Sequence, residues 1–181
     1  MAGWLVLVVG PSGAGKDSVL REAARELKGD ERFVFSRRVV TRQADANLED
    51  HDTISEPDFE QAAIDGKFML HWGAHGNFYG IPIAVERELA AGRIVCINVS
   101  RAILAETATR FSNLIVVEIT APIEMRVARI LMRGRESQET VMARALRDVP
   151  DYPKGINLIT ILNDGTLRDA IIQFTRLLRG L

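Results

Sequence analysis

Short, mostly apolar runs recur along the chain and alternate with segments whose apolar residues are spaced as on one face of a helix. The apolar runs have the length and β-branched content of strands buried on both faces. They are Trp4–Val9, Phe33–Val40, Arg93–Val99, Asn113–Ile119 and Asn157–Leu162. The segments with helical spacing are Lys16–Leu27, Ser55–Gly66, Pro82–Ala91, Arg101–Arg110, Ile123–Met132 and Thr166–Leu178. This alternation predicts an α/β fold of three layers, a central parallel sheet with helices on both faces.

The pattern contains no internal repeat or linker, so residues 1–181 are expected to form one domain. Two polar stretches interrupt it, at 41–54 and at 133–145. Both are predicted to be excursions from the sheet.

The sequence between the first strand and the first helix is GPSGAGKDS, from Gly10 to Ser18. Glycines in such a loop let successive N–H groups point inward at phosphate oxygens, and the helix N-terminus adds its positive dipole end. Lys16 can reach the β- and γ-phosphates. Strand, loop, lysine and helix together predict an ATP site. Its residues are Gly10, Pro11, Ser12, Gly13, Ala14, Gly15, Lys16, Asp17 and Ser18.

Asp17 departs from the usual loop, in which serine or threonine follows the lysine and binds Mg²⁺. Here Ser18 comes one residue later. Asp17 either favours the helix N-terminus or helps to hold the metal directly or through water, since Mg²⁺ prefers oxygen ligands. Asp17 and Ser18 are therefore the candidate metal residues, with Mg²⁺ as the expected cofactor.

The amino-acid composition and charge bear on which partners the protein can bind. The formal net charge is −1 and 26% of residues are charged, which gives no general support for nucleic-acid binding. No stretch approaches the length of a membrane span, and Trp4–Val9 lacks the basic flank of a signal peptide, so a cytoplasmic protein is expected. The single cysteine, Cys96, lies in an apolar run and is expected to be a core residue.

Several further motifs resemble the guanylate kinase superfamily, in the same order along nearly the whole chain. They are Thr41-Arg42, HGNFYGIP at 75–82, and RGRES at 133–137 followed by Arg144. The resemblance implies a phosphate-loop core, a substrate-binding region at about 36–80 and a mobile lid at about 133–145. By position, Arg42 and Tyr79 would contact the acceptor phosphate. Arg133 and Arg144 would clamp the ATP phosphates as catalytic residues beside Lys16 and Arg42.

The same resemblance puts Asn163-Asp164 where the family approaches the nucleotide base. One segment departs from guanylate kinases, which follow Thr-Arg with a longer stretch that reads guanine. Here residues 43–51 are shorter, and His51 falls where the family has a tyrosine.

The departures resemble one branch, the ribose 1,5-bisphosphate phosphokinases of phosphonate breakdown. The shared segments are GKDS, VTR, EDH at 49–51, FYG, Ser100-Arg101, RGRE and NDG at 163–165. This likeness implies transfer of the ATP γ-phosphoryl group to ribose 1,5-bisphosphate, giving phosphoribosyl diphosphate. The implied substrate-binding residues are Arg38, Arg42, His51, Tyr79 and Arg101.

The implied chemistry needs no general base, because the acceptor phosphate is already ionised near neutral pH. Arginines would position two anions and screen their repulsion. Arg126 and Arg129 are equally well explained as surface charges, and His51 as a loop histidine without a partner. The run Arg93–Val99 ends in Asn98-Val99, where related kinases often place a carboxylate. We therefore hypothesise that Asp17 compensates for that missing charge.

Two alternatives stay open. A guanylate kinase would share the fold, ATP and lid, although the guanine-reading segment is absent. A non-catalytic module that binds a phosphorylated partner would usually have a degraded phosphate loop, whereas Gly10, Gly15 and Lys16 are intact here. The sequence does not determine the oligomeric state, and a homodimer is one possibility.

Overall fold

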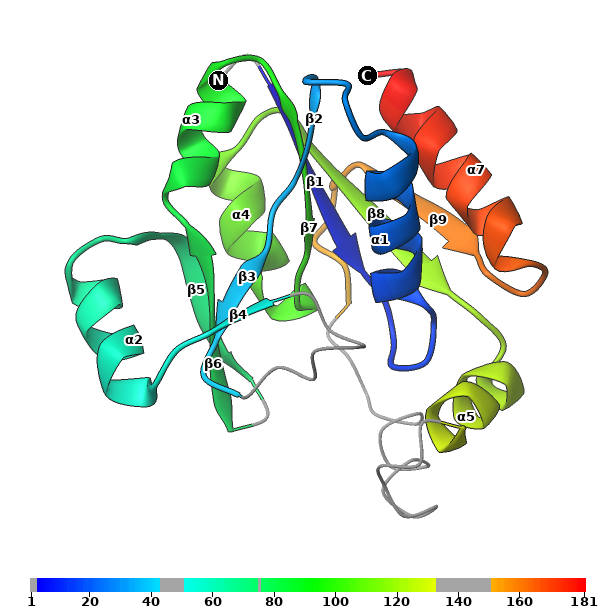
Figure 1. The fold of residues 1–181 in the computed structure, drawn as a ribbon, viewed down its shortest axis with the longest axis horizontal. Coiled ribbons are helices and arrows are strands. Elements are labelled where there is room, and N and C mark those ends of the chain that lie inside the picture. Colours follow the sequence, from blue (N-terminus) through cyan, green and yellow to red (C-terminus); the bar gives the residue numbers. More distant parts are fainter. Residues whose placement is uncertain (1–2, 43–50, 75, 133–150) are drawn as a thin grey trace.

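A parallel sheet of five strands forms the centre of the protein (Figure 1). The computed structural model describes residues 3–42, 51–74, 76–132 and 151–181. The strand order of the core sheet is β2-β7-β1-β8-β9, and every neighbouring pair is parallel. The strands are β1 (Trp4–Val9), β2 (Phe33–Phe35), β7 (Ile94–Asn98), β8 (Leu114–Thr120) and β9 (Leu158–Leu162). The predicted parallel sheet is confirmed.

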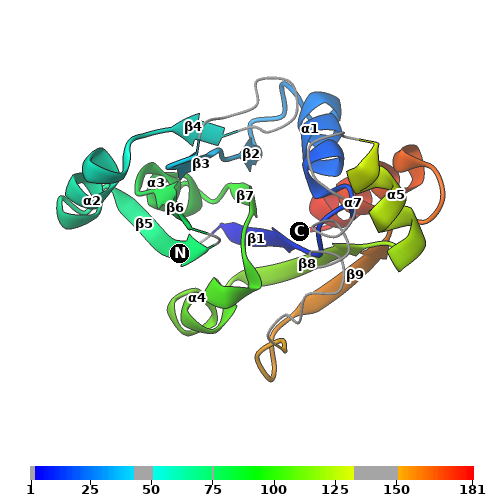
Figure 2. The same ribbon diagram turned by 90° about the horizontal axis from the view of Figure 1, so that it is seen from below.

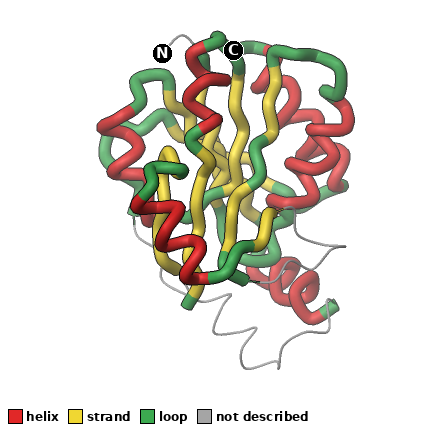
Figure 3. The backbone as a smooth tube through the Cα atoms, turned by 60° about the vertical axis from the view of Figure 1, so that its left-hand side comes forward, coloured by secondary structure: helices red, strands yellow, loops and turns green. Residues whose placement is uncertain are grey.

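The central strand, β1, is covered on both faces, because Leu5 to Val9 are all fully buried. On one face, Leu5 and Leu7 join a cluster with Leu89 of α3 (Ala84–Ala90) and Leu104 of α4 (Leu104–Arg110). Figures 2 and 3 show helices on both sides of this sheet.

The other face of the core sheet packs against α1 (Lys16–Glu26) and α7 (Leu167–Arg179). There Val6 and Val8 meet Val19 of α1 and Phe174 of α7. Alternate residues of one strand thus serve two opposite cores, as expected for a strand that is apolar throughout. The three-layer arrangement predicted from the sequence is confirmed.

A second sheet of four strands, which we call the acceptor sheet, lies beside the core sheet. Its order is β4-β3-β6-β5, and β3–β4 is its one parallel pair. Its strands are β3 (Arg38–Val40), β4 (His51–Thr53), β5 (Phe68–Ala74) and β6 (Asn77–Pro82). The short helix α2 (Glu56–Ile64) packs on β5 through Phe59, whose ring stacks on Phe68 at 4.6 Å.

The prediction of one strand over Phe33–Val40 was wrong. The chain leaves the core sheet after Phe35, at Ser36, whose N–H donates to the carbonyl of Cys96. It enters the acceptor sheet at Arg38. The chain changes sheet at Arg37 and Arg38, the two arginines in the middle of the run. Residues 41–54 were expected to be strand-poor, but β4 lies at their end, and β5 and β6 were not predicted as strands.

Most helix boundaries lie within two residues of the predicted ones. Ser55 caps α2, and its hydroxyl accepts from the N–H of Asp58. Thr166 and Asp169 form a reciprocal capping box at the start of α7. The segment Arg101–Arg110 begins instead with a 3₁₀ turn at Arg101–Ile103, and the α-helix starts at Leu104. α5 covers Ile123–Leu131.

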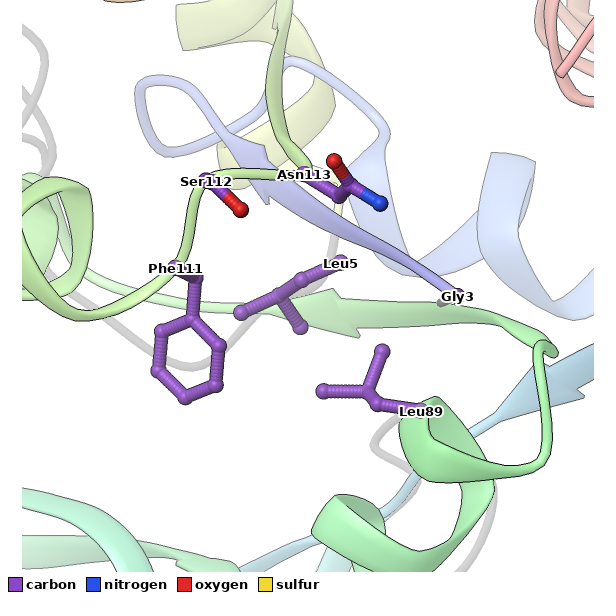
Figure 4. Close-up of a pocket in the computed structure, with 6 residues that line it drawn as sticks. All are labelled: Gly3, Leu5, Leu89, Phe111, Ser112 and Asn113. Atoms are coloured by element: carbon purple, nitrogen blue, oxygen red, sulfur yellow. The ribbon is translucent and has the colours of Figure 1, made fainter. Parts of the chain in front are cut away.

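The core also contains a buried cysteine and a small cavity. Cys96 is 1% exposed, and burial raises its pKa, which agrees with the predicted core role. A cavity of about 10 Å³ lies at the amino end of β1 (Figure 4) and is too small for a substrate. Its lining consists of Gly3, Leu5, Leu89, Phe111, Ser112 and Asn113.

Within the described ranges, no helix is long and apolar enough to cross a membrane.

Candidate active site

The glycine-rich loop joins β1 to α1 at the carboxyl edge of the core sheet. Gly10, Gly13 and Gly15 have positive φ angles of 141°, 79° and 92°. A Cβ atom at Gly10 would lie 2.0 Å from the carbonyl oxygen of Ile119, and one at Gly13 would lie 2.5 Å from that of Arg126. The backbone conformation and the close approach of neighbouring carbonyls therefore both require glycine at these two positions.

Lys16 begins α1, and its side chain turns back toward the loop. Its Nζ donates to the carbonyl oxygens of Gly10 at 2.8 Å and Pro11 at 3.2 Å. The ammonium therefore lies beside a helix N-terminus that already favours anions. Ala14 is buried in the loop, and Ser12 and Ser18 are half-buried. An ammonium beside a helix N-terminus and a glycine-rich loop is an arrangement that suits a phosphate anion.

Asp17 faces the end of β7, the strand next to β1. Its Oδ1 accepts a hydrogen bond of 2.6 Å from Nδ2 of Asn98, the last residue of β7. Both residues are half-buried. The carboxylate of Asp17 thus lies beside the position where the sequence lacks one, as the compensation hypothesis requires.

Asn163 follows β9 and is 3% exposed. Its Nδ2 donates to the carbonyl of Ala14 at 2.8 Å, and a Cβ at Gly15 would lie 2.5 Å from the same nitrogen. Its Oδ1 is buried and has no hydrogen-bond partner within the described residues. The hydrogen bond to Ala14 therefore stabilises the loop. The Oδ1 atom is left as a buried acceptor for another group, which fits the expected place of Asn163 near the nucleotide base.

Arg126 and Arg129 lie three residues apart on α5, and both are half-buried. Arg126 Nε donates to the carbonyl of Ala121 at 3.1 Å, and Arg129 Nη2 donates to that of Asn163 at 3.1 Å. The alternative in which both are solvated surface charges was therefore wrong. Each side chain instead donates to a backbone carbonyl that follows a core strand, β8 for Arg126 and β9 for Arg129.

We expect Asn163→Asp to raise KM for ATP about tenfold and to lower the melting temperature, because a carboxylate oxygen would face the Ala14 carbonyl where an N–H now donates. The measurements are steady-state kinetics and thermal unfolding. Asp164→Asn is the control, since Asp164 is the exposed next residue. An unchanged KM and melting temperature in Asn163→Asp would contradict the assigned role.

Tyr79 and Arg38 come together on the acceptor sheet. Tyr79 is 9% exposed, and its ring stacks on Trp72 with 5.4 Å between centroids. The guanidinium of Arg38 lies 5.8 Å from the centroid of the Tyr79 ring, within cation–π range. Packing thus fixes a hydroxyl-bearing ring and a cation close to each other, two of the groups implied for the acceptor.

His51 is the most deeply buried charged or polar side chain of the acceptor sheet, at 2% exposed. Its Nε2 lies 3.2 Å from the carbonyl oxygen of Arg42, and its own carbonyl accepts from Arg37 Nη2 at 2.9 Å. The interpretation of His51 as a loop histidine without a partner was wrong. Its imidazole ties β4 to the backbone of Arg42, whose side chain is exposed.

Arg101 makes contacts that sequence reasoning missed. Its Nη2 forms an ion pair with Oε1 of Glu118 on β8, and its guanidinium lies 4.7 Å from the centroid of the Tyr152 ring. Burial raises the pKa of Tyr152, and the neighbouring Glu118 carboxylate raises it further. One signal for this cluster was present in the sequence, because Glu118 is the single charged residue of β8.

The predicted lid arginines, Arg133 and Arg144, lie outside the described residues, as do Arg135, His75 and residues 43–50. Apart from Arg101 beside Glu118 and Asn163 beside the loop, most of the remaining predicted side chains fall into two groups. Lys16, Asp17 and Ser18 gather at the loop, and Arg38, Arg42, His51 and Tyr79 gather on and beside the acceptor sheet.

A glycine-rich loop follows the central strand of a parallel sheet, and a lysine side chain turns back over it. A separate sheet carries an arginine beside it. Together these features define a phosphate-loop kinase. The guanylate kinase family model matches residues 3–179. The chain belongs to the guanylate kinase family.

Curated relatives are similar over most of the chain. A protein of Methylobacterium radiotolerans named ribose 1,5-bisphosphate phosphokinase PhnN is 45% identical over 181 residues, which is 99% of each chain. One of the same name from Brucella melitensis is 44% identical over 163 residues, 90% of this chain and 85% of that one.

A longer relative from Cupriavidus pinatubonensis, named bifunctional ribose 1,5-bisphosphokinase-thymidine phosphorylase, is 40% identical over 179 residues. The match covers 99% of this chain but only 30% of that relative's length. Among solved structures, guanylate kinase from Anaplasma phagocytophilum superposes with a TM-score of 0.69 at 18% identity, over 99% of this chain and 86% of that one. That likeness supports the fold.

Proposed function

We propose that this protein transfers the γ-phosphoryl group of ATP to ribose 1,5-bisphosphate, giving 5-phosphoribosyl 1-diphosphate and ADP. The observation that carries the proposal is the likeness to proteins named for this kinase activity, at 45% identity over 99% of both chains. The geometry of the loop supports it. Lys16 is held beside the loop by two backbone carbonyls, ready to meet phosphate oxygens.

In this proposal the acceptor phosphate is bound on the acceptor sheet side, by Arg38, Arg42 and Tyr79. Arg38 and Tyr79 already lie within cation–π distance of each other. His51 supports this group indirectly, because it contacts the backbone of Arg42. The acceptor oxygen is ionised near neutral pH, so the residues need to position the phosphates and screen their charge, with no general base.

The proposal includes Mg²⁺ beside ATP, which when bound neutralises charge on the transferred phosphoryl group. Asp17 is the carboxylate best situated to direct it, and Ser18 is the nearby hydroxyl. Within the described ranges no group of three or more histidine, cysteine or acidic side chains could hold a metal. A site with one carboxylate fits Mg²⁺, which usually keeps several waters and binds substrate phosphates.

A coupled assay of ADP release tests the function directly. We expect kcat/KM with ribose 1,5-bisphosphate to exceed that with GMP by about 100-fold or more, because a site without guanine-binding groups leaves the base without polar partners. Fast turnover with GMP alone would favour the guanylate kinase alternative. Absence of ATP binding in calorimetry would favour the non-catalytic module. A cytoplasmic location is a further prediction, and a homodimer is one possible oligomeric state.

A further inference from the structure

Arg101, Glu118 and Tyr152 form a half-buried cluster, which we call the Arg101 cluster, at the carboxyl edge of the core sheet. The side chains of Arg101 and Glu118 are 15% and 16% exposed. Tyr152 covers the face of the guanidinium, and it packs against the apolar cluster that includes Val9 and Val99. Charges this far from water are costly unless they are well paired. The ion pair and the ring therefore fix the guanidinium in one place.

The strand order places this cluster across the end of β1, beside the start of the phosphate loop. Arg101 follows β7, which lies between β1, the strand that leads to the loop, and β2, the strand that leads to the acceptor sheet. Glu118 pairs in register with Val9, the residue before Gly10. The Arg101–Glu118 ion pair therefore crosses the end of β1, where the loop begins.

The cluster also lies on the acceptor side of the core sheet. Val9 and Val99, which flank it, belong to the same apolar cluster as Trp72 and Tyr79 of the acceptor sheet. Asp17 and Asn98 lie on the opposite face, with α1. The loop thus has the metal-directing candidates on one face and the Arg101 cluster on the other.

The guanidinium of Arg101 has further hydrogen-bond donors besides those that pair with Glu118. Guanidinium has five N–H donors, and the described residues supply a hydrogen-bond acceptor to its Nη2 group. Within the described ranges Nη1 and Nε have no acceptor, so they are the donors we assign to an anion, and arginine binds phosphate through such paired donors. A guanidinium already fixed in orientation loses little entropy on binding.

The proposed acceptor carries two phosphates, one that reacts and one at the other end of the sugar. Arg38, Arg42 and Tyr79 are assigned to the reacting phosphate, so the second phosphate needs another cation. We propose that Arg101, oriented by Glu118 and Tyr152, binds the 5-phosphate of the acceptor. This inference rests on the proposed function and makes Arg101 a specificity-determining residue, with Glu118 and Tyr152 as positioning residues.

The test compares kinetics of the wild type and Arg101→Ala with ribose 1,5-bisphosphate, and uses ribose 5-phosphate and ribose 1-phosphate as competitive inhibitors. Loss of a charged hydrogen bond should raise KM for the bisphosphate about 10- to 100-fold with a smaller change in kcat. The Ki of ribose 5-phosphate should rise in parallel. The Ki of ribose 1-phosphate and the KM of ATP should stay within about twofold, because their phosphates bind elsewhere.

Matched variants separate binding from folding. Arg93→Ala is the control, since Arg93 precedes the same strand and pairs with Glu88 at 2.6 Å at the opposite end; it should change none of these constants. Glu118→Gln should raise KM for the bisphosphate less than Arg101→Ala, and Arg101→Lys should recover part of the loss. If Arg101→Ala is unstable, Arg101→Met with Glu118→Leu removes both charges at similar volume and should show the same selective loss.

Equal increases in the Ki of both monophosphates, or an unchanged KM for the bisphosphate in Arg101→Ala, would overturn this inference alone. Wild-type protein that does not turn over ribose 1,5-bisphosphate would overturn the proposed function and this inference with it.

Discussion

Lys16→Ala is expected to lower kcat by about 10³-fold or more, because removal of a cation that stabilises charge in phosphoryl transfer has costs of this order. The amine of Lys16 now donates to the carbonyls of Gly10 and Pro11. Because these are exchangeable contacts, the ammonium can turn to a phosphate without rearrangement of the loop. Alanine removes the charge and leaves the glycine backbone unchanged.

The control for this variant lies just after the same helix. Lys28 is exposed just beyond the carboxyl end of α1, so Lys28→Ala removes an equal charge away from the loop. Turnover by ADP release and melting temperature should be measured for both variants. Lys28→Ala should keep its activity, and both proteins should remain folded. A fully active Lys16→Ala protein would refute the assignment of the loop as the catalytic phosphate site.

The second large effect is expected at Asp17. Asp17→Asn keeps the shape of the side chain and an oxygen that can accept from Asn98, but it removes the charge. If this carboxylate directs Mg²⁺, the Mg²⁺ concentration for half-maximal activity should rise about tenfold or more, with kcat lowered about 100-fold, the scale of losing one electrostatic contact to the reacting groups. Titration of activity with Mg²⁺ and calorimetry of ADP binding with and without Mg²⁺ measure both effects.

The hydrogen bond between Asp17 and Asn98 allows an exchange experiment. In Asp17→Asn combined with Asn98→Asp, the carboxylate moves across a contact of 2.6 Å and the hydrogen bond can re-form. We expect this double variant to recover much of the Mg²⁺ dependence, whereas Asn98→Asp alone sets two carboxylates together and should lose activity. A double-mutant cycle expresses the recovery as a coupling free energy.

A helix-dipole effect is the alternative explanation of Asp17. Glu124 lies in the first turn of α5, so Glu124→Gln removes the same kind of helix-terminal charge. Such charges are worth about 0.3–1 kcal/mol of stability. If Asp17→Asn behaves like Glu124→Gln, with a small loss of stability and unchanged Mg²⁺ dependence, or if Asp17→Ser retains full Mg²⁺ affinity, the metal-directing role is wrong.

The core sheet and its helices were predictable because their signals are local. Trp4–Val9 is apolar at every position, and such a run suits a strand covered on both faces. The caps of α2 and α7 are equally local, because Ser55 and Asp58, like Thr166 and Asp169, are only three residues apart. The glycine loop is likewise contained within one strand, one turn and one helix.

The acceptor sheet was not predictable in the same way. Its strands β3 and β4 have three residues each, too few to show a period of alternation. β3 continues from the core strand β2 with no turn residue between them, so the run Phe33–Val40 looked like one strand. Only pairing with β6 and with β4 gives β3 its own sheet.

The sequence by itself therefore determined that this protein is an α/β phosphate-loop kinase, because Gly10–Ser18 and the strand and helix that flank it carry that information locally. The tertiary structure decided which distant residues share the site. Asp17 meets Asn98 across 81 positions, and Arg101 meets Glu118 across 17. The reason is physical: which side chains meet at a sheet's carboxyl edge depends on strand order and register, which arise only when the strands pair.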